Sequence, residues 1–304
     1  MKRMNYQELL AQHPAIFCHL NNLGIIKVEG PDAKQFLQGQ LTCDLNSLTP
    51  ENPIIGGLYC NIQGRIISAF GLFFDGKDYL LLMPTDIVPL TLVRLKKYSM
   101  FSKVTLTDAT PLFHITGLIG LQCEAFIKKL PSDVTIIKIP SEPIRYLLIH
   151  SADKTEIILS ESVEAPEELW RYCDIQSGVA NIHPETQEKF LPHELNYQNL
   201  GFISFNKGCY LGQEIIARMH YKGKLKYHLK KVIFETEKSL KPGTSIFDTE
   251  DPSREIGTVV DALPISSNQT LALVILHEQA LDKTRVHIGE ELPIQMRTSL
   301  DLPK

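Results

Sequence analysis

The sequence lacks several patterns that would assign a common function. No G-x-G-x-x-G opens a helix after a strand pattern, and no G-x-x-x-x-G-K-S/T occurs, so neither a dinucleotide loop nor a phosphate-binding P-loop is predicted. None of the six cysteines forms a C-x-x-C pair, which argues against a metal or cluster site built from neighbouring thiols. Cysteine this sparse in a chain of 304 residues also argues against a disulfide framework.

Long apolar runs are absent as well. No stretch of about 18 apolar residues exists, so no membrane-spanning segment is expected. The first ten residues are polar and lack the apolar core of a signal peptide, which predicts a cytoplasmic protein with free thiols. The formal net charge of −4 argues against broad, non-specific binding of nucleic acid but is compatible with a local basic patch.

What is present is the composition of a globular protein, with 43% hydrophobic and 22% charged residues. Three strands at 54–60, 65–74 and 79–83 are separated by turn residues and predict a β-meander. A helix with Asp32 as its N-cap is expected to stop at Gly39. Further strands are predicted at 23–28, 103–107, 112–118, 134–139, 145–150 and 156–159, and further helices at 4–12, 86–98, 123–130 and 165–175. This mixture of strand pairs and helices indicates an α+β fold.

The last part of the chain is rich in strands, at 228–235, 243–247, 255–261, 270–276 and 284–288. Short strands at this spacing indicate a small barrel or a sandwich. We therefore predict an α+β region over 1–225 and an all-β domain over 226–304.

The stretch with the clearest chemistry is 201–218, in which Gly208 and Gly212 lie on either side of Cys209. Glycines at this spacing predict a tight bend or a close approach of the backbone. A thiolate is the reactive form of cysteine, and Lys207 would lower the pKa of Cys209 if both side chains point the same way. Glu214 would oppose that effect. The alternative is an inert cysteine buried in a tight loop.

The segments around this bend are short. The apolar run from Phe202 to Phe205 is predicted to be a buried strand, and 214–219 is compatible with either a helix or a strand. The 181–200 segment is polar, has no clear period and is predicted to be a functional loop. His183 and His193 lie in it without a metal-binding spacing, so we interpret them as structural or exposed.

The segment K-G-C-Y-L-G-Q-E at 207–214 resembles the signature of the YgfZ family, folate-binding proteins related to the T-protein of the glycine cleavage system. Residues 32–42 resemble that family's N-terminal motif, and Leu191-Pro192, Asn196 and 200–205 resemble the lead-in to its cysteine. The resemblance implies a T-protein-like fold of two interwoven α+β domains followed by a C-terminal antiparallel β-barrel. It also implies a bound tetrahydrofolate or another reduced folate, and a role in assembling or repairing iron–sulfur enzymes, including tRNA-modifying ones.

The resemblance further implies roles for individual residues. Cys209 would be the reactive group with Lys207 beside it, and no metal site is expected. Trp170 stands where the family's folate-binding tryptophan lies, although a lone tryptophan on a helix is otherwise expected in the packing core. The cofactor site would comprise Trp170, Gln176, Leu23, Asn196, Tyr210, Gln213 and Glu214. Leu23 stands near the place of a second family tryptophan, and Gln176 replaces a T-protein glutamate and so cannot form a charge-assisted pair.

The catalytic aspartate of the T-protein has no counterpart here, because Ser68 and Ala69 occupy the acidic positions of the matching segment. A serine does not replace a carboxylate in proton transfer near neutral pH, so aminomethyl transfer by that mechanism is not predicted. Two alternatives stay open. One is a folate-dependent one-carbon transferase or demethylase that uses other residues.

The other alternative is a tRNA-binding module. The stretch 218–231 is basic and without acidic residues, and it includes Arg218, Lys222, Lys224 and Lys226. These side chains are expected to form a solvated surface, to contact the glutamate tail of folate, or to contact RNA or a partner protein. No RNA-recognition motif is present to decide among the three.

Overall fold

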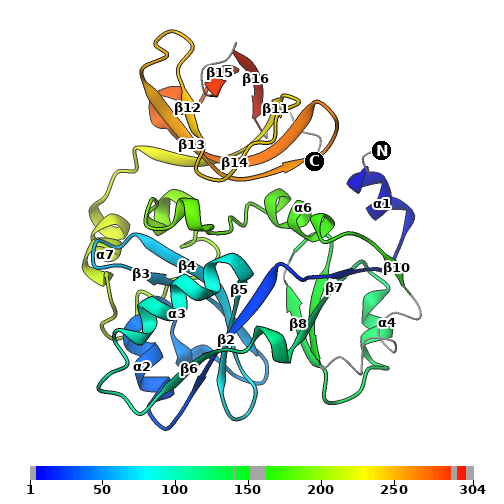
Figure 1. Ribbon diagram of the computed structural model, residues 1–304, viewed down its shortest axis with the longest axis vertical. Coiled ribbons are helices and arrows are strands. Elements are labelled where there is room, and N and C mark those ends of the chain that lie inside the picture. Colours follow the sequence, from blue (N-terminus) through cyan, green and yellow to red (C-terminus); the bar gives the residue numbers. More distant parts are fainter. Residues whose placement is uncertain (1–4, 140, 151–161, 289–292, 299–304) are drawn as a thin grey trace.

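The computed structural model describes residues 5–139, 141–150, 162–288 and 293–298. It contains two five-stranded sheets side by side and a closed barrel at one end of the molecule (Figure 1). The predicted strand at 156–159 lies outside the described residues. Two sheets with helices between their strands, followed by a barrel, confirm the predicted α+β class and the C-terminal antiparallel barrel.

The first sheet is antiparallel and has the strand order β3-β4-β5-β2-β6. Its strands are β2 (Leu23–Glu29), β3 (Ile54–Cys60), β4 (Ile66–Phe74), β5 (Tyr79–Pro84) and β6 (Thr105–Asp108). The side chains of Asn61 and Asp75 accept hydrogen bonds from backbone N–H groups in the two hairpin turns, which fixes these turns locally. The predicted β-meander is therefore confirmed.

The second sheet has the order β10-β1-β7-β9-β8, and β1 pairs in parallel with β10 while the other pairs are antiparallel. Its strands are β1 (Ile16–His19), β7 (His114–Ile119), β8 (Thr135–Ile139), β9 (Arg145–His150) and β10 (Val163–Glu164). The sequence pattern missed β1 and β10 because four and two residues are too short to show a period.

The barrel closes in the order β11-β14-β13-β12-β15-β16, with β16 pairing back to β11. Its strands are β11 (Tyr227–Glu235), β12 (Ser245–Phe247), β13 (Glu255–Pro264), β14 (Gln269–His277), β15 (Arg285–Ile288) and β16 (Ile294–Thr298). Closure decides between the barrel and the sandwich that the sequence left open. All six strands lie within the predicted second domain, although the boundary near 225 itself stays a prediction.

The helices are α1 (Tyr6–Gln12), α2 (Ala33–Gln40), α3 (Val88–Lys96), α4 (Cys123–Ile127), α6 (Glu168–Gln176) and α7 (Gln213–Lys222). Short 3-10 turns connect them: η1 (Leu45–Ser47), η2 (Thr85–Ile87), η3 (Thr110–Leu112), η5 (Pro184–Thr186), η6 (Pro192–Leu195) and η7 (Glu278–Ala280). No helix of the described residues is long and apolar enough to cross a bilayer.

Three local predictions need correction. Gly39 lies inside α2, which ends only at Gln40. Asp32 does not cap this helix through its side chain, because its carboxylate accepts a hydrogen bond from the Lys103 N–H at 2.7 Å. The run from Phe202 to Phe205 is not a strand, since it forms single hydrogen bonds rather than a ladder, and the segment that follows is the helix α7.

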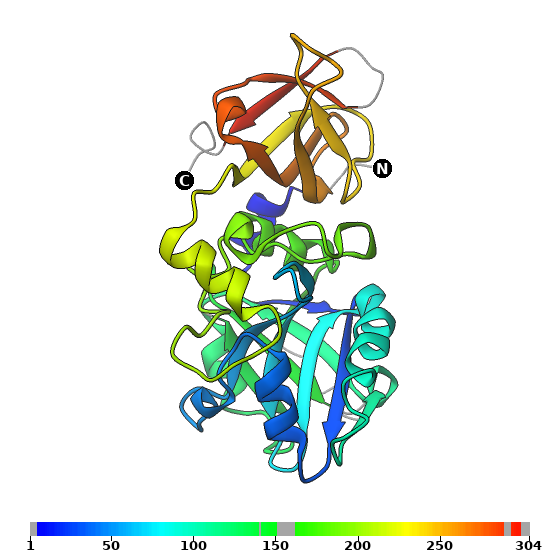
Figure 2. The same cartoon turned by 90° about the vertical axis from the view of Figure 1, so that its left-hand side faces the viewer.

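The apolar side chains of β13 show how the barrel packs against α6. Inside the barrel, Val259 and Ala262 of β13 belong to an apolar cluster of the barrel's own strands. Val260 and Leu263 of the same strand belong instead to the main cluster, which includes Leu169 and Trp170 of α6 and side chains of both sheets. Because the register of β13 shifts between Val259 and Asp261, Val259 and Ala262 share the face toward the barrel interior, and Val260 and Leu263 share the face toward α6. Figures 1 and 2 show the barrel above α6, with the chain passing from α7 up to β11.

Candidate functional site

The loop that carries Cys209 is anchored by a half-buried lysine, Lys207. The Nζ of Lys207 donates hydrogen bonds to three backbone carbonyls at the end of α2 and just beyond it: Gln38 at 2.7 Å, Leu41 at 2.8 Å and Cys43 at 2.7 Å. An ammonium group has three N–H donors, so all of its hydrogen bonds are used within the 38–43 segment. Lys207 therefore fastens the loop to the end of α2.

Backbone hydrogen bonds strengthen this attachment. The N–H of Ser204 donates to the Thr42 carbonyl at 2.9 Å, and the N–H of Leu211 donates to the Gly39 carbonyl at 3.2 Å. The Thr42 hydroxyl donates to the Phe202 carbonyl at 2.7 Å. The two motifs at 32–42 and 207–214, far apart in the sequence, thus form a single structure.

Of the two glycines on either side of Cys209, only Gly212 lies where glycine is required. Gly212 has φ +80°, and a Cβ there would collide with the Asn61 carbonyl oxygen in the β3–β4 turn. A side chain at this position would be strained both by the left-handed conformation and by the close approach of the turn. Gly208 has neither restriction, because a Cβ there would meet open space.

Cys209 differs from the other five cysteines in its exposure. It is exposed, whereas Cys18, Cys43, Cys60, Cys123 and Cys173 are buried. Burial raises the pKa of each buried thiol, to about 12 for Cys18 and Cys43 and to about 11 for Cys123 and Cys173, so these thiols stay protonated near neutral pH. The geometry gives Cys209 the access to solvent and partners that a reactive thiol needs, and it removes the alternative of a buried, inert cysteine.

The predicted partnership of Lys207 with Cys209 stays a prediction, and the hydrogen bonds of Lys207 are directed elsewhere. Burial lowers the pKa of Lys207 to about 8, so the charged form still predominates at pH 7. The ammonium also lies 5.3 Å from the centre of the Tyr210 ring, which is itself buried. Tyr210 therefore covers the lysine.

Two further motif residues lie in the first turn of α7. Gln213 is half-buried, whereas Glu214 is exposed and pairs with Arg218 at 2.7 Å along the helix. This pairing turns the Glu214 carboxylate toward its own helix. Its predicted part in a cofactor site stays untested.

The remaining predicted residues lie on three different elements: Trp170 and Gln176 on α6, Leu23 at the start of β2, and Asn196 directly after η6, which packs against α7. Trp170 is only 6% exposed, and the Arg145 guanidinium lies 4.6 Å from its ring centre. Gly117 approaches the ring edge so closely that a Cβ there would collide with it. The indole is therefore a packed residue, and stacking of a pterin on it stays a prediction.

Gln176 ends α6 and connects it to the barrel. Both its backbone and its side-chain oxygen accept hydrogen bonds from the Nζ of Lys231 on β11, at 3.1 and 2.8 Å. Lys231, which the sequence placed in a basic stretch, therefore points into the junction. Leu23 is half-buried at the start of β2, and Asn196 takes the left-handed conformation after η6, with φ 59°.

A buried polar cluster at this junction was missed by sequence reasoning. Arg171 of α6 donates to Asp261 of β13 through Nε at 2.9 Å and through Nη2. His183 Nδ1 lies 3.2 Å from Asp86 Oδ2, and its Nε2 lies 3.8 Å from Asp261 Oδ1. The sequence feature that could have indicated the cluster is Asp261, a carboxylate within the otherwise apolar run 259–263. His183 was predicted to be structural or exposed.

Neighbouring charges in this cluster shift the pKa values of His183 and Asp261. Burial by itself would lower the pKa of His183, but Asp261 and Asp86 outweigh it and raise the pKa to about 9. Burial would raise the pKa of Asp261, but His183 and Arg171 hold it below its usual value. Two buried atoms, Asp261 Oδ2 and His183 Nε2, have no hydrogen-bond partner among the described residues.

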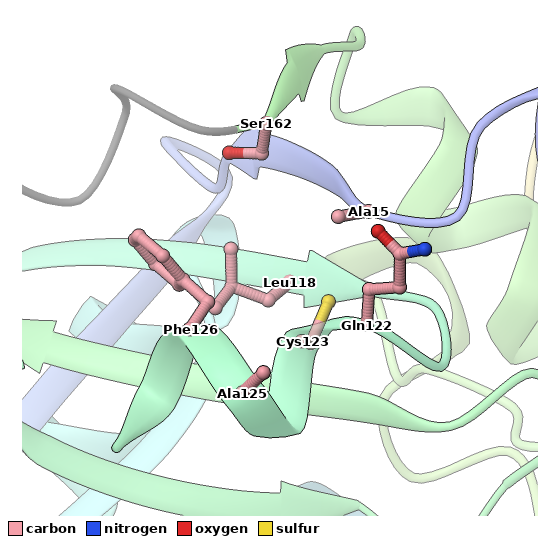
Figure 3. A pocket seen from close by; sticks show the side chains of 7 residues that line it. All are labelled: Ala15, Leu118, Gln122, Cys123, Ala125, Phe126 and Ser162. Carbon is pink, nitrogen blue, oxygen red and sulfur yellow. The ribbon is translucent and has the colours of Figure 1, made fainter. Parts of the chain in front are cut away.

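A cavity of about 160 Å³ lies beside α4 and is lined by Leu118, Cys123, Phe126 and Ser162 among others (Figure 3). A second cavity, of about 430 Å³, lies between the segment 43–55 and the loop 201–206, beside the cysteine loop. Across the described ranges, no group of three His, Cys, Asp or Glu side chains is placed to hold a metal ion.

The amino-acid sequence is similar to those of known proteins. The chain is 35% identical over 235 residues to the tRNA-modifying protein YgfZ of Colwellia psychrerythraea, covering 71% of each protein. It is 31% identical over 302 residues to the YgfZ protein of Photobacterium profundum, covering 94% of this chain and 90% of that one. The chain belongs to the YgfZ family. This confirms the resemblance seen in the 32–42 and 207–214 motifs.

The fold of this YgfZ-family chain is that of the T-protein. Its structure matches the glycine cleavage system aminomethyltransferase T of Bartonella henselae with a TM-score of 0.75, covering 97% of this chain and 87% of that one at 15% identity. No protein-family model matches the chain.

Proposed function

We propose that this chain is a cytoplasmic folate-binding accessory protein that supports the assembly or repair of iron–sulfur enzymes, including tRNA-modifying ones, through Cys209. The observation that carries the proposal is the one exposed thiol, presented on a loop that Lys207 and Gly212 hold in place. The relatives named tRNA-modifying proteins and the shared T-protein fold support the same reading.

In this proposal, residues at the α6–barrel junction would hold the pterin. A pterin carries N–H donors beside a carbonyl oxygen along one edge. Asp261 Oδ2 is a buried acceptor without a partner, and the charged His183 offers an N–H at Nε2 that also has none in the described part of the chain. Asp261 and His183, with Gln176 at the end of α6, would hold the ring. Trp170 and Leu23 would support it.

Cys209 is assigned the chemistry that a solvent-exposed thiol can perform. Its thiolate would bind iron of a client's cluster or act as a redox thiol while the client is held at the loop. Tyr210, Gln213 and Asn196 would shape the surroundings of that loop. Aminomethyl transfer is not part of the proposal, because Ser68 is fully buried on β4 and no carboxylate stands at its position or at Ala69.

The thiol is tested in cells that lack this chain and depend on an iron–sulfur tRNA-modifying enzyme. Cys209→Ser should abolish rescue of that enzyme's activity while the purified variant unfolds at the wild-type urea concentration. Gly208→Ala, in the same loop and facing open space, is the matched control and should rescue fully. Full rescue by Cys209→Ser would refute the assignment.

Folate binding is tested separately by titrating the single tryptophan, Trp170, with tetrahydrofolate under anaerobic conditions and following its fluorescence. Saturable quenching is expected, and Asp261→Asn should weaken it by about tenfold because the charge-assisted bond is lost. Absence of both quenching and calorimetric heat would refute the folate part. Turnover of a methyl-carrying substrate with tetrahydrofolate would instead identify a one-carbon enzyme.

A further inference from the structure

The cavity beside the cysteine loop is large and polar enough to hold a small organic group. Its volume of about 430 Å³ lies within the range of ordinary ligand pockets, roughly 300–1,000 Å³. Five of its lining side chains carry hydroxyl, amide or carboxylate groups: Asp44, Ser47, Asn52, Ser204 and Asn206. The hydroxyl and amide groups both donate and accept hydrogen bonds and the Asp44 carboxylate accepts them, which together suits the edge of a nucleobase and a ribose hydroxyl.

An aromatic row leads from this cavity to the end of α7. Phe205 lines the cavity, and its ring stacks on His220 with 3.8 Å between ring centres and 17° between planes. Tyr221 meets His220 edge-on at 4.8 Å and is 68% exposed. The row therefore begins at a polar pocket and ends at an exposed aromatic ring.

Positive charge lies at the same end of α7. Lys222 and Lys226 are exposed, and their ammonium groups have no ion-pair partner in the parts of the chain that the structure describes. Lys224 pairs with Glu278 at 3.4 Å but is itself 85% exposed, so this pair is weak. These lysines can therefore neutralise phosphates without first breaking a strong ion pair within the protein.

We propose that this surface binds an unpaired segment of RNA, with one nucleotide in the cavity, a neighbouring base on Tyr221, and phosphates beside Lys222 and Lys226. Exposed aromatic rings next to cations are the usual means of binding a single strand. The serine and asparagine groups of the cavity suit the 2′-hydroxyl, which favours RNA over DNA. This contact goes beyond the proposed function and does not depend on folate.

The test is fluorescence anisotropy with a labelled, unstructured ten-nucleotide RNA of mixed sequence, without folate and at several salt concentrations. Tyr221→Ala should weaken binding by about tenfold because a stacked base is lost. Replacing Lys222 and Lys226 together by alanine should reduce the slope of log affinity against log salt by about 1.4, or about 0.7 for each phosphate released. Asn206→Ala should change the preference among the four bases.

The chain offers a control outside this surface. Phe101 is 99% exposed and lies near the exposed Lys96 and Lys97 in the sequence, so this segment presents an aromatic ring and two lysines without the cavity. Replacing these three residues by alanine should leave RNA binding unchanged.

Four results would overturn the proposal. They are no RNA binding by the wild-type chain at micromolar concentration, wild-type affinity in the Tyr221 and lysine variants, an equal loss in the control, and equal affinity for DNA of the same sequence. Variants that bind RNA normally but lose an iron–sulfur client protein would assign this face to a protein partner and would also overturn it.

Discussion

Replacing Lys207 by methionine tests how the cysteine loop is held. Methionine has a similar length and is apolar, so it fills the space of the lysine stem but donates nothing to the carbonyls of Gln38, Leu41 and Cys43. We expect the loop to detach from the end of α2 while the sheets and the barrel stay folded.

The magnitude of the stability loss follows from three contributions. Three hydrogen bonds from a charged donor stabilise the native state by roughly 4.5 kcal/mol, taking the lower value for each bond. Burying the charge costs about 3 kcal/mol, because the pKa of Lys207 falls from 10.5 to about 8. The variant also leaves the three carbonyls without a donor, which costs about 1–3 kcal/mol more. We therefore expect a net loss of about 2.5–4.5 kcal/mol of unfolding free energy.

Two measurements check this expectation at pH 7. Urea unfolding gives the loss of stability, and hydrogen exchange should show faster exchange of the Ser204 and Leu211 amides, whose acceptors lie in the same segment. Lys222→Met is the control, because Lys222 is exposed, and it should change neither.

The same variant separates anchoring from activation. If Lys207 instead lowered the pKa of Cys209, the methionine variant would keep its stability and its amide protection, and alkylation of Cys209 by iodoacetamide would shift to higher pH. That result would refute the anchoring role.

The remaining predictions concern the glycine bend, the thiols and the junction. Gly212→Ala should cost more than about 2 kcal/mol of stability in urea unfolding and Gly208→Ala less than about 0.5, because only the first has a left-handed backbone and a carbonyl in its way; equal costs would contradict this account. Ellman's reagent should modify one thiol per native chain, Cys209, and all six after unfolding; a second fast thiol would contradict the burial of the others. The raised pKa of His183 stabilises the fold fully below about pH 6.5, and this stability, about 3 kcal/mol, is lost as pH rises through about 9. Urea unfolding at pH 7 and 10 should show this loss in the wild type and a smaller one in His183→Asn.

The sequence by itself determined what depends on neighbours along the chain. Asn61 and Asp75 with their following glycines define two hairpin turns, and the apolar runs between them define the β-meander. The motifs at 32–42 and 207–214, with the segment between 191 and 205, indicated the family and the T-protein fold. The turns and strands of the meander could be predicted because turn formation and strand periodicity are local effects.

Only the tertiary structure decided which side chains meet. That Lys207 serves the carbonyls of 38–43, more than 160 residues earlier, could not be read from its position two residues before Cys209. Nor could the meeting of Arg171, His183 and Asp261 across α6 and the barrel. The physical reason is that such contacts depend on how the sheets and the barrel pack. Packing brings together residues that are far apart in the sequence, and the residues next to each of them do not indicate its partner.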